Sequence, residues 1–169
     1  MTSSPRRISV VVPTRDRPAL VRQALASIRA HEGPLYSFEI LVADNGTTPE
    51  TPLVAEAFGA TYIKVDEHGA GAARNAGLRA ATGDYVAFLD DDDVWLPSHL
   101  GKHFEALDAD PKIEAVLGQV IYTDQELQPL GAPYPADAPP SGVDLLKKLL
   151  GDYLPQIGTL VARACVLAS

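Results

Sequence analysis

The chain has 169 residues, of which 46% are hydrophobic and 21% charged, a composition typical of one globular domain. Its formal net charge of −8 argues against non-specific nucleic-acid binding, which needs a basic surface, but it is compatible with an anionic ligand held through a metal. No apolar run is long enough for a membrane helix, and the single cysteine, Cys165, excludes an internal disulfide and fits a reducing cytoplasm.

From residue 8 to about residue 110, apolar runs of strand length alternate with segments of helical periodicity. The predicted strands are the runs 8–12, which Pro13 ends, 38–43, 61–65 and 85–89. The predicted helices begin at Pro18, after Pro49, at Gly69 and at Pro97. Asp16 can cap the first of these helices. This alternation predicts an α/β fold with a mostly parallel central sheet and helices on both faces.

The C-terminal third is less regular. Two further strands are expected, one within 113–122 and one in the apolar segment 156–162. The Pro- and Ala-rich stretch 130–142 predicts a long loop, and a helix is expected to follow it as far as Leu150. Cys165 lies among apolar residues and is expected to be part of the core.

Four consecutive carboxylates, Asp90–Asp93, follow the buried strand at 85–89. Because burying unpaired ions is very costly, these side chains should lie in a loop open to water at the strand's carboxyl end. In an extended segment Asp90 and Asp92 point to the same side and Asp91 to the other. Two carboxylates on one side form a hard oxygen site suited to Mg²⁺ or Mn²⁺. A solvated acidic turn is the alternative interpretation.

Polar residues also end the first two strands. Thr14 and Arg15 follow the first strand, and Asp44 follows the second. The carboxyl ends of parallel strands share one edge of a sheet, where α/β proteins bind ligands. We therefore expect these residues and the aspartates to converge on one crevice.

Four segments resemble, in order and spacing, the successive motifs of family 2 glycosyltransferases, which have the GT-A fold. They are ISVVVPTRD, LVADNG, GAARNAG and FLDDDDVWLP, at residues 8–16, 41–46, 71–77 and 88–97. The resemblance extends to about Tyr122. It implies a metal-dependent, inverting enzyme that transfers a sugar from a nucleotide-diphosphate sugar to an acceptor hydroxyl.

The resemblance also assigns roles on the nucleotide side. Pro13, Thr14 and Arg15 would line the base, although the family often has Tyr where Arg15 stands. Asp44 would accept a hydrogen bond from the base, typically uracil or thymine. A uridine- or thymidine-diphosphate sugar is thus the favoured donor.

On the phosphate side, the resemblance places Arg74 and Asn75 beside the ribose and phosphates. Asp90 and Asp92 form the family's DxD element, in which Asp92 would ligate Mg²⁺ or Mn²⁺ and Asp90 would touch the ribose and contribute to the metal site. Asp91, with Asp93, would support this donor site.

Such a reaction needs a carboxylate that takes the proton from the acceptor hydroxyl. The family places this base well downstream of the DxD element, and no counterpart is recognisable before Ser169; the position of Asp124 does not match. We expect residues 1–169 to form a single donor-binding domain, truncated in its acceptor half, with the catalytic base beyond Ser169. A non-catalytic nucleotide-sugar-binding module or an inactive donor-binding fragment is the alternative.

Three other features favour structural interpretations. His99 and His103 are four residues apart on a predicted helix, but without an HExxH glutamate they indicate a solvated helix face. The glycines at 69 and 71 follow the third strand and lack a correctly placed third glycine, which argues against a dinucleotide fingerprint. Trp95 is expected to pack beneath the aspartate loop.

Overall fold

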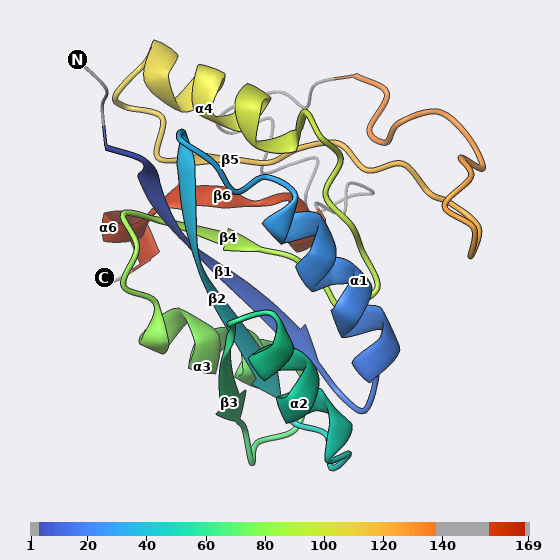
Figure 1. Ribbon diagram of the computed structural model, residues 1–169. Helices are drawn as coiled ribbons and strands as arrows, with labels where there is room; N and C mark the ends of the chain where they lie inside the picture. Colours follow the sequence, from blue (N-terminus) through green and yellow to red (C-terminus); the bar gives the residue numbers. More distant parts are fainter. Residues whose placement is uncertain (1–3, 138–155, 168–169) are drawn as a thin grey trace.

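The structure is a computed structural model that describes residues 4–137 and 156–167. Its centre is a six-stranded sheet with the order β3-β2-β1-β4-β6-β5 (Figure 1). The strands are β1 Arg6–Thr14, β2 Tyr36–Asp44, β3 Thr61–Lys64, β4 Tyr85–Phe88, β5 Ala115–Val116 and β6 Val161–Arg163. Strands β1 to β4 pair in parallel, and β6 is antiparallel to both β4 and β5. The predicted mostly parallel sheet is confirmed.

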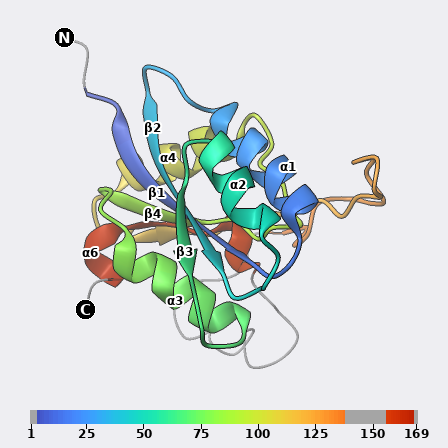
Figure 2. The same cartoon turned by 60° about the horizontal axis from the view of Figure 1, so that its bottom comes forward.

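Helices cover both faces of this sheet, as predicted (Figure 2). They are α1 Pro18–Arg29, α2 Glu50–Ala57, α3 Ala70–Ala80, α4 His99–Ala109 and α6 Ala164–Leu167, with a 3₁₀ turn η1 at Ile157–Thr159. The helix expected to reach Leu150 and the end of the expected 130–142 loop lie outside the described residues. In the part of the chain that is described, every helix is too short or too polar to cross a lipid bilayer.

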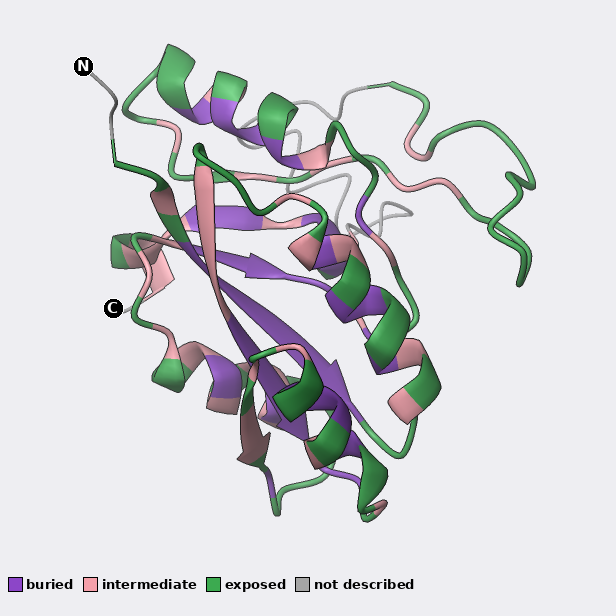
Figure 3. Cartoon of the chain, in the orientation of Figure 1, coloured by how far each residue is buried: buried purple, intermediate pink, exposed green. Residues whose placement is uncertain are grey.

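Strands β1 and β4 are buried along most of their length (Figure 3), and alternate residues of each strand belong to different core clusters. Val10 and Val12 of β1 pack with α1, α2 and α4 in the larger core cluster. Val11 of β1 and Val86 of β4 pack on the other face, against side chains of α3 and α6. Each fully buried aliphatic side chain contributes about 1.5–3 kcal/mol relative to an exposed one, so both layers hold the sheet firmly.

Helix α3 lies unusually close to the sheet because of Gly77. A Cβ atom on Gly77 would lie 2.3 Å from Cγ1 of Val11, which is closer than two carbon atoms can approach. Glycine at this position therefore allows α3 to rest directly on β1. The same helix carries Arg74 toward the carboxyl edge of the sheet.

Strand β1 does not end at Pro13, as the sequence predicted, but continues to Thr14. The carbonyl of Val11 accepts a hydrogen bond from Leu89, so Pro13, two residues on, also faces the β4 side. Pairing with β4 stops at Val11. The missing N–H of Pro13 thus falls where the sheet has no partner strand, a position that proline tolerates.

The predicted capping role of Asp16 is wrong. The N-cap of α1 is Arg17, and no side chain caps the helix. Asp16 has φ of 56°, a left-handed conformation that Asp tolerates, and its Oδ1 accepts the backbone N–H groups of Thr47 at 2.5 Å and Thr48 at 2.8 Å. These bonds lower the pKa of Asp16. Asp16 therefore joins the loop after β1 to the loop after β2.

The C-terminal elements differ from their predictions in detail. The 156–162 segment begins as η1, and its strand is shifted to Val161–Arg163, between β4 and β5. Cys165 is exposed rather than part of the core. It lies in α6, where Ala164 and Leu167 pack on the sheet and leave Cys165 on the outer side.

Candidate functional site

A pocket of about 400 Å³ opens at the carboxyl edge of the sheet. It is formed by the ends of β1 and β4, the residue after β2 and the first turns of α3. Its lining residues are Pro13, Thr14, Arg15, Arg17, Asn45, Gly69, Ala70, Ala73, Arg74, Asp90, Asp91 and Asp92. Of the residues predicted to converge on one crevice, Thr14, Arg15 and Asp90–Asp92 line this pocket, whereas Asp44 does not.

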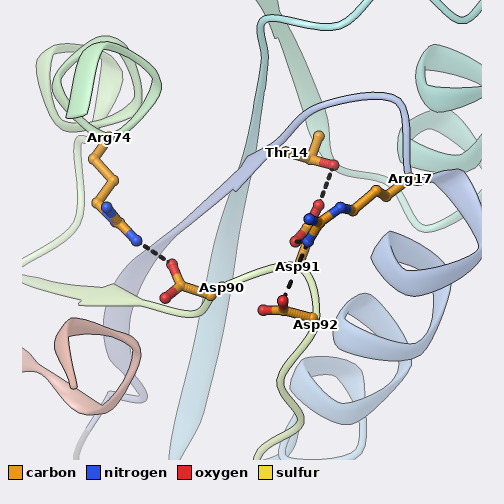
Figure 4. A network of polar contacts seen from close by, with 6 residues as sticks. All are labelled: Thr14, Arg17, Arg74, Asp90, Asp91 and Asp92. Carbon is orange, nitrogen blue, oxygen red and sulfur yellow. Dashed lines mark hydrogen bonds and ion pairs between the residues drawn. The ribbon is translucent and has the colours of Figure 1, made fainter. Parts of the chain in front are cut away.

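Asp91 anchors the aspartate loop to β1. Its side chain is only 8% exposed, and Oδ2 accepts the hydroxyl of Thr14 at 2.6 Å (Figure 4). Burial raises the pKa of Asp91, while the bonds from Thr14 and Arg17 act in the opposite direction. The aspartate loop is therefore fixed to β1 at Asp91, beneath the pocket.

Asp90 and Arg74 form an ion pair on the α3 side of the pocket, with Nη2 of Arg74 2.5 Å from Oδ1 of Asp90 (Figure 4). Both side chains are about three-quarters buried, with exposures of 22% for Arg74 and 24% for Asp90. Nε of Arg74 is buried and has no hydrogen-bond partner within the described residues. A donor thus remains free on a guanidinium that lines the pocket.

On the opposite side, Arg17 contacts two aspartates at once. Its Nη1 lies 3.2 Å from Oδ1 of Asp91 and 3.2 Å from Oδ2 of Asp92. Among Asp90, Asp91 and Asp92, the side chain of Asp92 is the most exposed, at 57%. Partial desolvation and the three neighbouring carboxylates raise the pKa of Asp93 to about 6.

Asp44 lies at the same edge of the sheet but is fully buried and does not line the pocket. Its Oδ1 accepts the N–H of Gly46 at 2.7 Å, and Oδ2 accepts the hydroxyl of Tyr62 at 3.2 Å. Desolvation raises the pKa of Tyr62, and the Asp44 carboxylate raises it further by its negative charge and by accepting the Tyr62 hydroxyl. Asp44 therefore shapes the loop after β2 in the structure as it stands.

Sequence reasoning missed five lining residues and included two that lie outside the pocket. The missed residues are Arg17, Asn45, Gly69, Ala70 and Ala73, whereas Asp44 is buried and Asn75 is exposed on α3. The Asn45 side-chain amide donates to the carbonyls of Glu67 and Gly69, so it positions the start of α3. Its place directly after Asp44, at the end of a predicted strand, was the available signal.

The residues at this rim suit a hard divalent cation. Asp90 and Asp92 offer oxygen ligands at an open edge, and each already binds a guanidinium, so this rim attracts positive charge. Within the described ranges, no three His, Cys, Asp or Glu side chains are grouped so that they could hold a metal by themselves. Mg²⁺ commonly takes one or two carboxylates and completes its shell with water and phosphate oxygens. Asp92 and Asp90 fit that arrangement.

A second cavity of about 320 Å³ lies between the aspartate loop, α4 and the segment 118–133, and shares Asp92 with the first pocket. The prediction of a solvated face at His99 and His103 is wrong. His103 is 4% exposed, and its ring nitrogens lie 2.7 Å from the His99 carbonyl and 2.8 Å from the Thr159 carbonyl. Burial lowers the pKa of His99 to about 3, and its ring stacks on Trp95.

His103 belongs to the buried stripe of α4, which it forms with three apolar residues at the spacing i, i+3, i+4 and i+7. This spacing in the sequence could have predicted that His103 is buried. The stripe consists of Leu100, His103, Phe104 and Leu107. Trp95 is 6% exposed and packs in the core beside Phe38, as predicted.

The profile of Glycosyl transferase family 2 matches residues 9–152 of this sequence. The chain belongs to glycosyltransferase family 2. It is 37% identical to the succinoglycan biosynthesis protein ExoW of Rhizobium meliloti over 112 residues, which cover 60% of this chain and 34% of that protein. It is 31% identical to the chondroitin synthase of Escherichia coli over 123 residues, 69% of this chain and 18% of the relative. The chain thus spans about a third or less of these relatives.

Solved structures show the same GT-A fold. S. aureus TarS in complex with UDP-GlcNAc superposes with a TM-score of 0.73 at 21% identity, over 96% of this chain and 46% of that chain. The mannosyltransferase PcManGT from Pyrobaculum calidifontis, in complex with GDP-Man and Mn²⁺, has a TM-score of 0.57 at 29% identity, over 69% of this chain and 36% of that one. PcManGT is a mannosyltransferase and both neighbours carry nucleotide-sugar donors, and the likeness shows that this member of glycosyltransferase family 2 has the GT-A fold.

Proposed function

We propose that the 400 Å³ pocket binds a nucleotide-diphosphate sugar with Mg²⁺ or Mn²⁺, and that the protein transfers the sugar to an acceptor hydroxyl with inversion. One observation carries this proposal. Arg15 and Arg17, in the loop between β1 and α1, and Arg74 of α3 line the pocket together with the aspartates that follow β4, so the same pocket offers ligands to a cation and to a diphosphate. Mn²⁺ in the PcManGT complex supports the use of a divalent metal.

Each group of this chain has a defined task in that proposal. Asp92 and Asp90 hold the metal, whose chemistry when bound is to neutralise the diphosphate leaving group. Arg74, with its free Nε–H, donates to the phosphates from the α3 side. Thr14 and Asp91 keep the loop in register with β1, so that these charges are in place before the donor arrives.

Base recognition is proposed for the wall formed by Pro13, Thr14 and Arg15, with Asp44 as the acceptor of a base N–H. Asp44 is fully buried and its two oxygens already accept Gly46 N–H and Tyr62 O–H, so in this proposal the base reaches Asp44 by replacing the longer Tyr62 bond of 3.2 Å. We favour uridine or thymidine on this basis. Guanosine is the competing base, since PcManGT carries GDP-Man. The single cysteine in the sequence supports a reducing, cytoplasmic location.

Donor binding and turnover are measured on the same sample. An enzyme and a binding module both bind the donor, and only the enzyme turns it over. Melting temperature is recorded with UDP, dTDP or GDP, each with and without Mn²⁺. A nucleotide at about 100 times its dissociation constant adds about 2.7 kcal/mol, which raises the melting temperature by roughly 5–10 °C at this size. Release of nucleoside diphosphate from donor sugars is then followed with candidate acceptors.

The outcomes separate the alternatives. A shift with UDP or dTDP that needs Mn²⁺ and disappears in Asp92→Ala supports the donor site. Equal binding with and without Mn²⁺ contradicts the metal proposal. Donor binding without any acceptor-dependent release favours the non-catalytic module. Asp124 is a poor candidate for the base, since it is exposed and its carboxylate accepts the N–H groups of Glu126 and Gln128 in its own turn.

A further inference from the structure

Arg17 lines the donor pocket, yet none of the sequence motifs gives it a task. It stands directly before α1, with a side chain that is 52% exposed. A single NH₂ group of this guanidinium serves both Asp91 and Asp92, at 3.2 Å from each (Figure 4). One positive charge is therefore divided between two carboxylates.

The two carboxylates differ in their freedom. The Asp91 side chain is 8% exposed and is also fixed by Thr14, whereas the Asp92 side chain is 57% exposed. Among the described residues, Arg17 is the only hydrogen-bond partner of the Asp92 carboxylate. A distance of 3.2 Å exceeds the roughly 2.7–2.9 Å of a strong charge-assisted bond, and exposed ion pairs are weak. The distance from Arg17 to Asp91 is the same, so the difference lies in burial: the pair with the buried Asp91 is shielded from water, and the pair with the exposed Asp92 is more easily broken.

We propose that Arg17 is a tethered counter-ion, which neutralises Asp92 while the donor pocket is empty and releases it to a divalent cation. This inference rests on the proposed metal-dependent donor site. Arg17 stays paired with Asp91 during the exchange, so its charge remains at the pocket wall beside the incoming diphosphate. Arg17 is thus a positioning residue that acts through Asp92.

The exchange has a measurable cost in metal affinity. Mn²⁺ must replace the guanidinium at Asp92, so removal of the guanidinium should tighten Mn²⁺ binding. An exposed pair of this kind corresponds to about two- to fivefold in an equilibrium constant. The gain should be absent when Asp92 itself cannot bind the metal.

The test titrates Mn²⁺ alone into the whole chain and follows water-proton relaxation. Arg17→Gln is expected to bind Mn²⁺ about two- to fivefold more tightly than the wild type. Arg22 is exposed on α1, so Arg22→Gln removes the same charge away from the pocket; it is the matched control and should not change the affinity. Equal or weaker binding by Arg17→Gln, or an equal gain in Arg22→Gln, overturns the inference.

Two further variants isolate the ion pair. Arg17→Lys keeps the charge and should stay close to the wild type, so a gain equal to that of Arg17→Gln contradicts the exchange. In an Asp92→Asn background, Arg17→Gln should gain nothing, because the competing pair no longer exists. A gain that persists in this background also overturns the proposal.

A measurement on the wild type covers the case in which Arg17→Gln does not fold. Mg²⁺ should move the Arg17 Nε–H signal in a ¹⁵N spectrum and leave the Arg22 signal unchanged; an unmoved Arg17 signal contradicts the exchange. Failure of the proposed function has a different signature, in which Mn²⁺ has no effect on UDP binding in the wild type.

Discussion

Replacing Thr14 by valine removes the hydroxyl that holds the aspartate loop and keeps the shape of the side chain. Thr14 is 5% exposed and Asp91 is 7% exposed, and their oxygens are 2.6 Å apart. A hydrogen bond to a charged group contributes about 1.5–3 kcal/mol, and its loss leaves a buried carboxylate oxygen without this donor. At about 2–4 °C per kcal/mol for a chain of this size, we expect the melting temperature to fall by roughly 3–12 °C.

The loss should depend on pH. Burial already raises the pKa of Asp91, and without the Thr14 hydroxyl, which lowers it, the pKa rises further. A carboxyl whose folded-state pKa is raised destabilises the native state at high pH, and this penalty is relieved as pH falls through that pKa. The stability difference between the Thr14→Val variant and the wild type should therefore be largest at neutral pH and shrink in acid.

Urea denaturation at neutral pH and again near about pH 4.5 measures this difference, with the fluorescence of the single, buried tryptophan Trp95 as the signal. Thr14→Ser keeps the hydroxyl and is the control, which should lose much less stability than Thr14→Val. The reasoning is refuted if Thr14→Val is as stable as the wild type at neutral pH. A loss that is the same at both pH values refutes the part that depends on Asp91.

Three further changes test other contacts. Gly77→Ala should cost about 1–3 kcal/mol in urea denaturation, since its Cβ would lie 2.3 Å from Val11, whereas Gly71→Ala on the same helix meets nothing within 4 Å and should gain up to about 1 kcal/mol. The pKa of His99 is about 3 in the folded protein, against 6.5 for a free histidine, so folding is stabilised above about pH 6.5 and loses stability as the pH falls toward 3. The loss should be about 2 kcal/mol at pH 5, and His99→Phe should reduce it. Asp16→Asn should weaken the carboxylate's bonds to Thr47 and Thr48 and lower the affinity for UDP with Mn²⁺ in calorimetry, whereas Glu32→Gln should not.

Much of the fold could be predicted from local pattern, because β-branched runs and helical stripes alternate through the first two-thirds of the chain. The C-terminal strands could not be placed in the same way. Strand β5 has only two residues, and the pairing of β6 with β4 joins Val161 to Ala87 across a long stretch of chain. Such pairing depends on tertiary contacts that no local periodicity encodes.

The site was predictable where polar residues directly follow buried strands, as Thr14 and Asp90 do. It was not predictable for Arg17, because its contact with Asp92 depends on the left-handed turn at Asp16 and on the loop after β4. Asp44 shows the converse, since its position at a strand end was foreseen and its complete burial was not. A strand end therefore predicts the edge at which a side chain lies, but not whether it faces a pocket.

The charges at this rim predict that metal and nucleotide bind together. Four aspartates against two paired arginines leave the loop about two charges negative, and like charges roughly 4 Å apart repel by about 4 kcal/mol at an effective dielectric of about 20. A diphosphate alone meets this repulsion, and a divalent cation reverses it. Linkage then requires Mn²⁺ to tighten UDP binding by the same factor as UDP tightens Mn²⁺ binding. Calorimetric titrations in both orders measure the two factors, and a factor of one in either order would show that the aspartates hold no metal beside the diphosphate.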